Sequence, residues 1–206
     1  MVLLPTLGWS ALGSVMFLGA QVQGPIITEA NLIYLLWYEG IALAILIPFL
    51  SARGWSRERL GIAASGRSTV LGLCLALLAY IAYAVIYNGA AAIFPGSTRS
   101  WEDLCLVAPH MAVAPIIAVS LMNPVFEELL YGYLIAVLND TRGFWFAVNA
   151  SVAVRLVCHL YQGAAGSLSI IALGLVFGCF YARTRKLWPL IVGHAVLDFI
   201  GLSTWK

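Results

Sequence analysis

The sequence is poor in charge. Of its 206 residues only 10% are Asp, Glu, Lys or Arg, whereas a soluble domain carries about 25% charged residues. A chain with so few charged side chains cannot cover a water-facing surface, which excludes a cytosolic enzyme and an intrinsically disordered protein. The net charge of +2 is also too small for an electrostatic footprint on DNA or RNA, so no nucleic-acid partner is expected.

Paired cysteines and a basic N-terminal segment are also missing. The four cysteines lie in apolar runs and none belongs to a CxxC pair. They predict small buried residues and not a disulfide framework or a zinc cage. The first charged side chain is Glu29, so the basic start of a cleavable signal peptide is absent. We therefore expect the first hydrophobic segment to stay in the membrane.

Long apolar runs take the place of charge, because 62% of the residues are hydrophobic. A membrane-spanning helix needs about 20 mostly apolar residues. The runs predict an all-α, polytopic bundle of about seven transmembrane helices that forms a single integral membrane domain over residues 1–206. The expected spans are roughly 7–22, 31–50, 69–93, 109–138, 144–162, 167–183 and 187–204.

Basic residues predict the orientation of this bundle. Four arginines lie between residues 51 and 68, and three basic residues lie in 183–186. By the positive-inside rule both segments face the cytoplasm, and so does the N-terminus of a protein in the plasma (inner) membrane. Dividing 105–139 into two helices would give eight spans and place the last basic loop outside. We prefer one long helix, bent at Pro115 and Pro124.

Ionisable side chains inside the apolar spans are the most informative residues. A charge at mid-bilayer costs at least about 2.5–3.5 kcal/mol, so these groups must face one another or a water-filled cavity. Two pairs lie four residues apart and share a helix face, namely Arg155 with His159 and His194 with Asp198. The adjacent Glu127 and Glu128 project about 100° apart, so one of them can face a cavity squarely. Glu39 has no partner at helical spacing, and we assign it to helix packing.

This set of side chains favours hydrolysis of an amide. A carboxylate in a low-dielectric pocket can take a proton from water, and a neighbouring imidazole can orient that water. A second imidazole with a further hydrogen-bond donor can stabilise an oxyanion on a carbonyl group. The sequence therefore predicts a hydrolase that uses neither a serine nor a cysteine nucleophile.

At these residues the sequence resembles the CPBP family, the CAAX protease and bacteriocin-processing group of intramembrane glutamic endopeptidases. That family carries EExxxR, then FxxxH, then HxxxN or HxxxD, on separate transmembrane helices. The corresponding segments here are Glu127 to Gly132, Arg155 to His159, and His194 to Asp198. The resemblance covers about 115–200, and we expect a CPBP-like catalytic core at about 105–204.

The resemblance implies a role for each of these residues. Glu127 would be the general base that activates water, His159 would help to hold that water, and Glu128 would support the site. His194 and Asp198 would form the oxyanion site. Because an ionised carboxylate cannot donate a hydrogen bond, Asp198 is either protonated or orients His194. The family mechanism is generally taken to be metal-independent, so no cofactor is expected.

Two departures from the family pattern occur. Gly132 stands where the family has arginine, and Arg155 stands where it has phenylalanine. We interpret them as one exchange, in which the guanidinium has moved to the histidine helix and pairs with Glu127 or Glu128, while Gly132 leaves room for it. The pairing requires Arg155 to lie within about 6 Å of one carboxylate. The alternative is that Arg155 only snorkels or binds a backbone carbonyl.

The prediction is thus an intramembrane endopeptidase that hydrolyses a peptide bond of a peptide or protein in or near the lipid bilayer. One alternative is a protease of the same fold that uses zinc, held by two histidines and a glutamate. The other is a non-catalytic scaffold or immunity-type membrane protein that keeps the polar cluster for packing.

Overall fold

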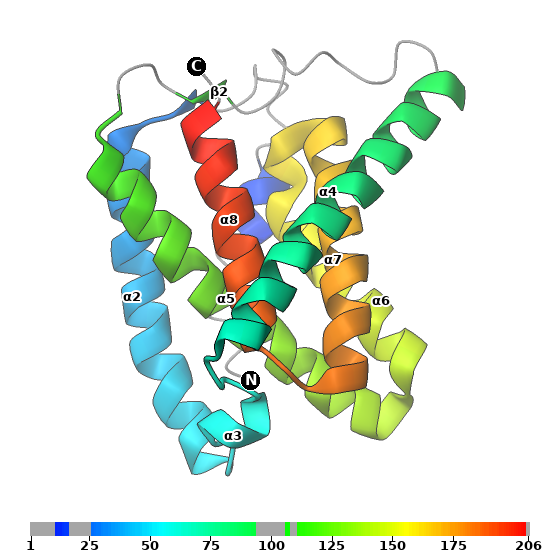
Figure 1. Cartoon of the computed structure of the whole chain (residues 1–206). Coiled ribbons are helices and arrows are strands. Elements are labelled where there is room, and N and C mark those ends of the chain that lie inside the picture. Colours follow the sequence, from blue (N-terminus) through cyan, green and yellow to red (C-terminus); the bar gives the residue numbers. More distant parts are fainter. Residues whose placement is uncertain (1–10, 17–25, 94–105, 108–110, 205–206) are drawn as a thin grey trace.

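A computed structural model of the chain describes residues 11–16, 26–93, 106–107 and 111–204, and these residues are almost entirely helical (Figure 1). Besides a helical turn at 11–16, the helices are α2 (Glu29–Ala52), α3 (Arg57–Leu60), α4 (Gly66–Ile93), α5 (Val113–Arg142), α6 (Phe144–His159), α7 (Gly163–Thr184) and α8 (Trp188–Thr204), with a 3-10 turn η2 (Leu160–Gln162). Two short strands, β1 (Ile26–Ile27) and β2 (Leu106–Val107), pair in parallel. The all-α prediction is confirmed.

Most of the predicted spans correspond to observed helices. The second to seventh spans match α2, α4, α5, α6, α7 and α8. The first span, 7–22, lies largely outside the described residues. Within 105–139 there is one long helix from Val113 and not two, as preferred above. Among the described residues, four helices are long and apolar enough to cross a membrane, while α6 and α8 are apolar but shorter. The chain is an integral membrane protein.

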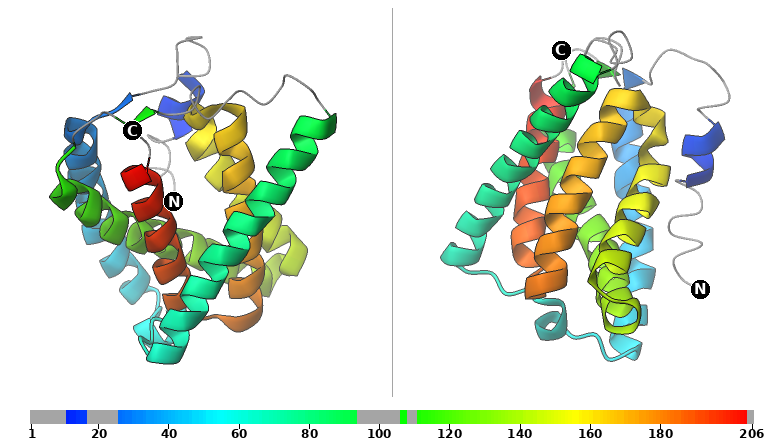
Figure 2. Two further views of the ribbon diagram at one scale, coloured as in Figure 1. Left: turned by 45° about the horizontal axis from the view of Figure 1, so that its top comes forward. Right: turned by 90° about the vertical axis from the view of Figure 1, so that its right-hand side faces the viewer.

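The helices run up and down through one bundle. Helices α2 and α5 lie in contact and run in the same direction, whereas α6, α7 and α8 follow α5 in alternating directions (Figure 1). Helix α4 packs against both α7 and α8 (Figure 2). Close approach of α4 to α8 depends on Gly72 and Gly193, since a Cβ on Gly193 would lie only 2.8 Å from the Gly72 carbonyl oxygen.

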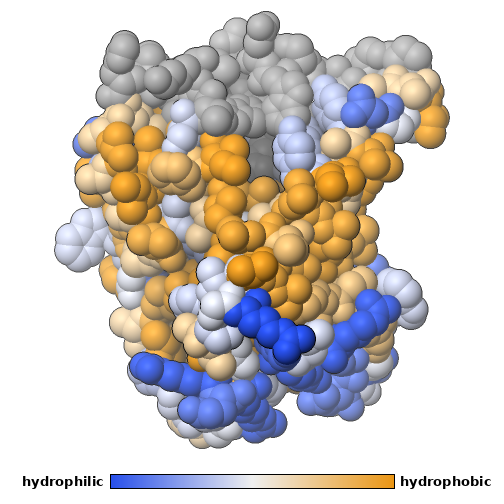
Figure 3. Space-filling model, in the orientation of Figure 1, coloured by the Kyte–Doolittle hydropathy of each residue, from blue (hydrophilic) through white to orange (hydrophobic). Residues whose placement is uncertain are grey.

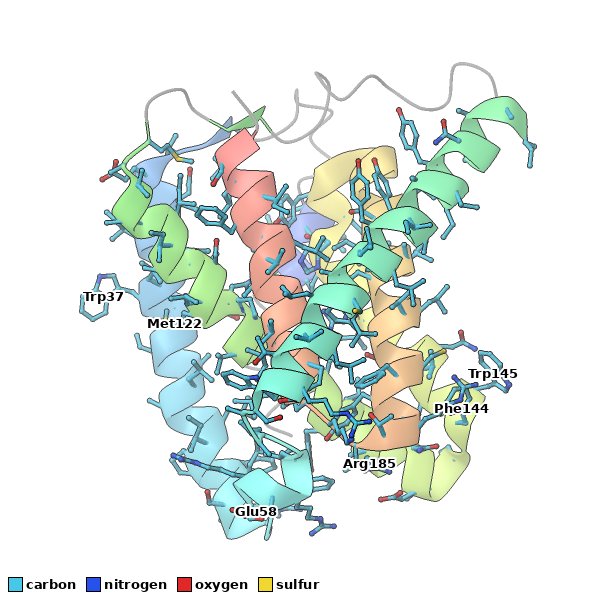
Figure 4. The ribbon with its side chains drawn as sticks, viewed as in Figure 1. Trp37, Glu58, Met122, Phe144, Trp145 and Arg185 are labelled. Atoms are coloured by element: carbon cyan, nitrogen blue, oxygen red, sulfur yellow. The ribbon has the colours of Figure 1, made fainter. Side chains whose placement is uncertain are left out.

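The surface agrees with a membrane location. Hydrophobic side chains cover the middle of the bundle, and hydrophilic side chains gather at the end that carries α3 and the α7–α8 turn (Figure 3). Trp37 and Trp145 point away from the bundle and are 72% and 64% exposed (Figure 4). Cys74 is exposed on this apolar surface, so the prediction that the cysteines are buried was wrong there; Cys158 is buried.

Two glycines form the turns at the hydrophilic end. Gly143 has φ +90° and separates α5 from α6. Gly61 has φ +74°, and a Cβ there would overlap the backbone carbonyl of Arg185, so the loop after α3 lies directly against the α7–α8 turn. The two prolines at which a bend was predicted lie differently in the long helix: Pro115 is in the first turn of α5, where its missing N–H is harmless, and Pro124 is inside the helix.

Candidate active site

A buried ion cluster joins α5, α6 and α8. The Arg155 Nη2 atom on α6 donates to both carboxylate oxygens of Glu128 on α5, at 2.7 Å each. The Nδ1 atom of His194 on α8 lies 2.8 Å from Glu128 Oε1. The side chain of Glu128 is 0% exposed, that of Arg155 is 3% exposed and that of His194 is 8% exposed. We call these three residues the inner layer.

Aromatic rings and a small residue hold the inner layer in place. The Arg155 guanidinium lies 3.9 Å from the ring centroid of Tyr131, which is buried on α5. Phe177 meets the His194 ring edge-on at 6.4 Å. Gly174 on α7 lets α6, the helix of Arg155, approach closely, because a Cβ there would lie 3.0 Å from Val152 Cγ2 on α6. Sequence reasoning missed Tyr131, although it lies one turn after Glu127 on the same face.

A second group of side chains lies beside the inner layer and reaches the surface. It consists of Glu127, His159 and Asp198, whose side chains are 12, 14 and 22% exposed. We call them the outer layer. Glu127 Oε2 accepts from Arg155 Nη1 at 3.3 Å, and Glu127 Oε1 lies 3.5 Å from His159 Nε2. The carboxylate of Glu127 is thus held by the inner layer on one side and faces an imidazole on the other.

The His159 ring has a defined orientation. Its Nδ1 atom lies 2.8 Å from the backbone carbonyl oxygen of Arg155, one turn earlier. Because a carbonyl oxygen only accepts, Nδ1 carries the hydrogen. The Nε2 atom is therefore the one that faces Glu127, at a distance too long for a strong direct hydrogen bond.

Asp198 bridges His194 and a residue that sequence reasoning left out of the site. Its Oδ1 atom lies 3.4 Å from His194 Nε2, and its Oδ2 atom accepts from Asn123 Nδ2 at 2.8 Å. Asn123 is half-buried on α5, one turn before Glu127. That spacing was the available signal, because residues four apart on a helix share a face.

The structure brings all six predicted site residues together. The predicted pairing of Arg155 with the glutamates is confirmed, because it contacts both carboxylates. The explanation offered for Gly132 was wrong. A Cβ on Gly132 would lie 2.6 Å from Leu187 Cδ1 and 3.4 Å from Tyr181 Cζ, so this glycine makes room for Leu187 and not for Arg155.

Glu39, assigned to helix packing from the sequence, lies on the buried stripe of α2. It is 1% exposed on α2, and its Oε2 atom has no hydrogen-bond partner among the described residues. Its electrostatic neighbours are, in order of strength, Glu127, Asp198 and His194. Glu39 therefore lies next to the outer layer, and helical spacing within α2 could not reveal partners on other helices.

The donor geometry gives the zinc alternative no support. Within the described part of the chain, no group of three or more His, Cys, Asp or Glu side chains is arranged to bind a metal ion. The Arg155 guanidinium contacts both glutamates that would supply an acidic ligand. A divalent cation there would meet a fixed positive charge.

Comparison with known proteins agrees with this geometry. Residues 109–200, which contain both layers, match the family described as Type II CAAX prenyl endopeptidase Rce1-like. This match supports the resemblance of the C-terminal half of the chain to the CPBP family. A Bacillus subtilis (strain 168) protein named "Putative membrane peptidase YdiL" is 27% identical over 103 residues, which cover 50% of this chain and 40% of the relative. No solved structure shows a significant match.

The CPBP region coincides with α5–α8, the helices that carry both layers. Asn123, Tyr131 and Gly174 also fall within it, whereas Glu39 does not. The chain spans less than half the length of the curated relative, so activity and substrate are proposals below.

Proposed function

We propose that this protein is a membrane-embedded protease of glutamic type that hydrolyses a peptide bond in a peptide or protein at the bilayer. The match of residues 109–200 to a family of CAAX prenyl endopeptidases supports a membrane protease. The observation that carries the glutamic mechanism is the contrast between two adjacent carboxylates. Glu128 is fully buried and bonded to Arg155 and His194, whereas Glu127 keeps Oε1 beside an imidazole and is 12% exposed.

In this proposal Glu127 is the general base. A water molecule that lies beside both Glu127 Oε1 and His159 Nε2, which are 3.5 Å apart, can bind to both atoms. Glu127 takes one proton from this water while the water oxygen bonds to the scissile carbonyl carbon. The carbonyl π electrons move to the oxygen and give a tetrahedral oxyanion.

His194 is the proposed donor to that oxyanion. Its Nδ1 faces Glu128 at 2.8 Å and its Nε2 faces Asp198 at 3.4 Å, so both ring nitrogens point at acceptors. An imidazole with two acceptor partners is favoured with hydrogens on both nitrogens. The longer contact leaves the Nε2 hydrogen available to an oxyanion. Of the two roles open to Asp198, this geometry supports the orientation of His194.

The inner layer positions these groups. Arg155 joins Glu128 to Glu127 through two different nitrogen atoms. It thereby fixes the Glu127 carboxylate and offsets part of the negative charge of the pair. We assign Glu128 and Arg155 to support and not to proton transfer.

Glu127→Gln tests the proposed function most directly. The amide cannot accept a proton at neutral pH, so we expect peptide cleavage by the protein in liposomes to fall by about 10²–10⁴-fold. Substrate peptides come from comparing membrane peptides of cells that express the wild type with those of cells that express the variant. Glu58→Gln is the matched control, since Glu58 is an exposed glutamate on α3. Full activity of Glu127→Gln would reject the base assignment.

The two alternatives give different results. A zinc-dependent protease would lose activity with a chelator and recover it with zinc, whereas we expect no effect of either. A non-catalytic scaffold would keep its cellular phenotype when Glu127 is replaced by alanine. A phenotype that survives in Glu127→Ala, with no peptide that differs between the two membrane samples, would favour the scaffold.

We also propose a plasma-membrane location with the α3 end in the cytoplasm. Hydrophilic side chains gather at that end of the bundle (Figure 3), and the basic residues of 51–68 and 183–186, which lie there, support this orientation. A single cysteine introduced at Ser56, in a variant with the native cysteines replaced, should react with a membrane-impermeant reagent only after the membrane is opened. Reaction in intact cells would reverse the orientation.

A further inference from the structure

Glu39 lies level with the proposed general base, on a helix outside the family-matched region. Helices α2 and α5 are parallel, and three sets of contacts fix their register: Leu32 with Ile116 and Val119, Tyr38 with Phe126 at 6.3 Å between ring centroids, and Phe49 with Tyr133 at 6.1 Å. Glu39 directly follows Tyr38 and lies on the same buried stripe as Leu32 and Ala42. The register therefore places it opposite the turn of α5 that carries Asn123 and Glu127.

The carboxyl group of Glu39 differs from the other carboxyl groups of the site in its surroundings. Glu127 and Glu128 contact the Arg155 guanidinium, and Asp198 accepts from Asn123 and faces His194. Glu39 has no ion pair or hydrogen bond to Oε2 within the described residues, although it is almost completely buried. Its strongest electrostatic neighbours are two other acids, Glu127 and Asp198, followed by His194.

The surroundings of Glu39 and Glu127 differ in whether a cation contacts the carboxyl group. Glu127 accepts a charge-assisted hydrogen bond from Arg155 at 3.3 Å. Glu39 lies mid-way along a membrane helix beside other acids and lacks a cation of its own, and hydrocarbon accommodates a neutral acid far better than a carboxylate. Two carboxyl groups whose environments separate their protonation states are a general indication of an acid and a base in one site.

We propose that Glu39 is the general acid of this site and protonates the leaving amine. This inference rests on the proposed function. Water gives one proton to Glu127 and its oxygen bonds to the carbonyl carbon. The Glu39 carboxyl then gives its proton to the amide nitrogen, the C–N bond breaks with its electron pair going to nitrogen, and the carbonyl re-forms. A proton passed from Glu127 to Glu39 through cavity water restores both groups, so the sum is peptide plus water to acid plus amine.

A pair of substrates with different leaving groups tests this role. The first is a synthetic peptide that spans a cleavage site found in the membrane-peptide comparison, and the second is the 4-nitrophenyl ester of its acyl segment. The phenolate leaves without a proton, so it needs no general acid. We expect Glu39→Gln to lower peptide cleavage by about 10²–10⁴-fold and ester cleavage by less than about tenfold. Glu127→Gln should lower both, because both need the activated water.

Other outcomes overturn the inference. If Glu39→Gln lowers cleavage of both substrates equally, Glu39 is a structural or positioning residue. If it lowers cleavage of neither substrate, Glu39 serves only in helix packing. If Glu39→Gln does not fold, Glu39→Asp is the second test, since aspartate retains a carboxyl group. It should preserve the wild-type ratio of peptide to ester cleavage, and a changed ratio would count against an acid role.

Infrared spectroscopy supplies a readout that does not depend on activity. A neutral carboxylic acid shielded from water gives a C=O band above the carboxylate bands. We expect this band in the reconstituted wild type and in Glu127→Gln, and its loss in Glu39→Gln. Absence of the band from the wild type would refute a neutral Glu39 even if Glu127 proves to be the base. Conversely, we expect the band of a neutral Glu39 even if the protein proves not to be a protease.

Discussion

The inner and outer layers of the polar cluster share acids and histidines but differ in contact lengths and exposure. Each layer contains a histidine and at least one acid. In the inner layer every contact is short, at 2.7–2.8 Å, and side-chain exposure does not exceed 8%. In the outer layer the contacts of the imidazoles with Glu127 and Asp198 are 3.4–3.5 Å, and exposure is 12–22%.

This difference fits a structural role for the inner layer and a catalytic role for the outer layer. Buried charges are tolerated only when they are paired, so the inner layer must be nearly saturated with hydrogen bonds. A group that moves a proton needs the opposite, namely an unsatisfied atom within reach of water. Changes in the inner layer should therefore act first on stability, and changes in the outer layer should act first on activity.

The largest effect on stability is expected for Arg155→Met. This change leaves Glu128 buried without its cation and should lower the free energy of unfolding by about 3–5 kcal/mol. The measurement is a denaturant titration in detergent, followed by tryptophan fluorescence. The double variant Glu128→Gln with Arg155→Met is the matched control and should recover much of the loss. If Arg155→Met is as stable as the wild type, the inner layer does not hold the fold.

A smaller loss is expected for Gly132→Arg, which restores the arginine of the family motif on α5. The Cβ of the new side chain would already clash with the Leu187 side chain, and overpacking of this kind costs about 1–3 kcal/mol. The same denaturant titration measures this loss of free energy of unfolding. Gly132→Ala, which adds a smaller side chain, should lose less. An unchanged free energy of unfolding would mean that the guanidinium of the inner layer can be supplied from either helix.

Asp198→Asn tests whether a change in the outer layer acts on activity and not on stability. Asparagine can still accept from Asn123 and orient His194, but it removes the negative charge that faces Nε2. We expect roughly tenfold slower cleavage, equivalent to about 1.4 kcal/mol in the transition state, with an unfolding midpoint close to the wild type. A loss beyond a hundredfold would indicate that Asp198 takes part in proton transfer itself.

The smallest effect is expected at an ion pair outside the cluster. Arg185 Nη2 and Asp140 Oδ1 are 2.6 Å apart, but the Asp140 side chain is 61% exposed. Solvent screens such a pair, so Asp140→Asn should change the free energy of unfolding by less than about 1 kcal/mol. A loss as large as that of Arg155→Met would remove burial as the reason for the inner layer's importance.

Sequence periodicity predicted the helices and the contacts within a helix. The apolar runs located α2 and α4–α8, and the i,i+4 spacing placed Asp198 beside His194 on α8. It also placed Arg155 and His159 on one face of α6, where the structure has them both in contact with Glu127. The first span, 7–22, stays largely a prediction, because most of it lies outside the described residues.

Contacts between helices were predicted less well. Asn123 and Tyr131 were not assigned to the site, and Gly132 was matched to the wrong neighbour. Each of these errors concerns which face of one helix meets which turn of another. That register depends on crossing angle and on small residues such as Gly174, neither of which periodicity specifies.

The sequence by itself determined that this chain is a helical membrane protein with acids, histidines and an arginine that must pair, because hydrocarbon penalises every charge left alone. The tertiary structure decided how they pair. It saturated Glu128 and left Glu127 open, although the two are neighbours in the chain, because adjacent helical residues point about 100° apart and only one faces both Arg155 Nη2 and His194. It also brought Glu39 of α2 level with them, through the packing of α2 on α5.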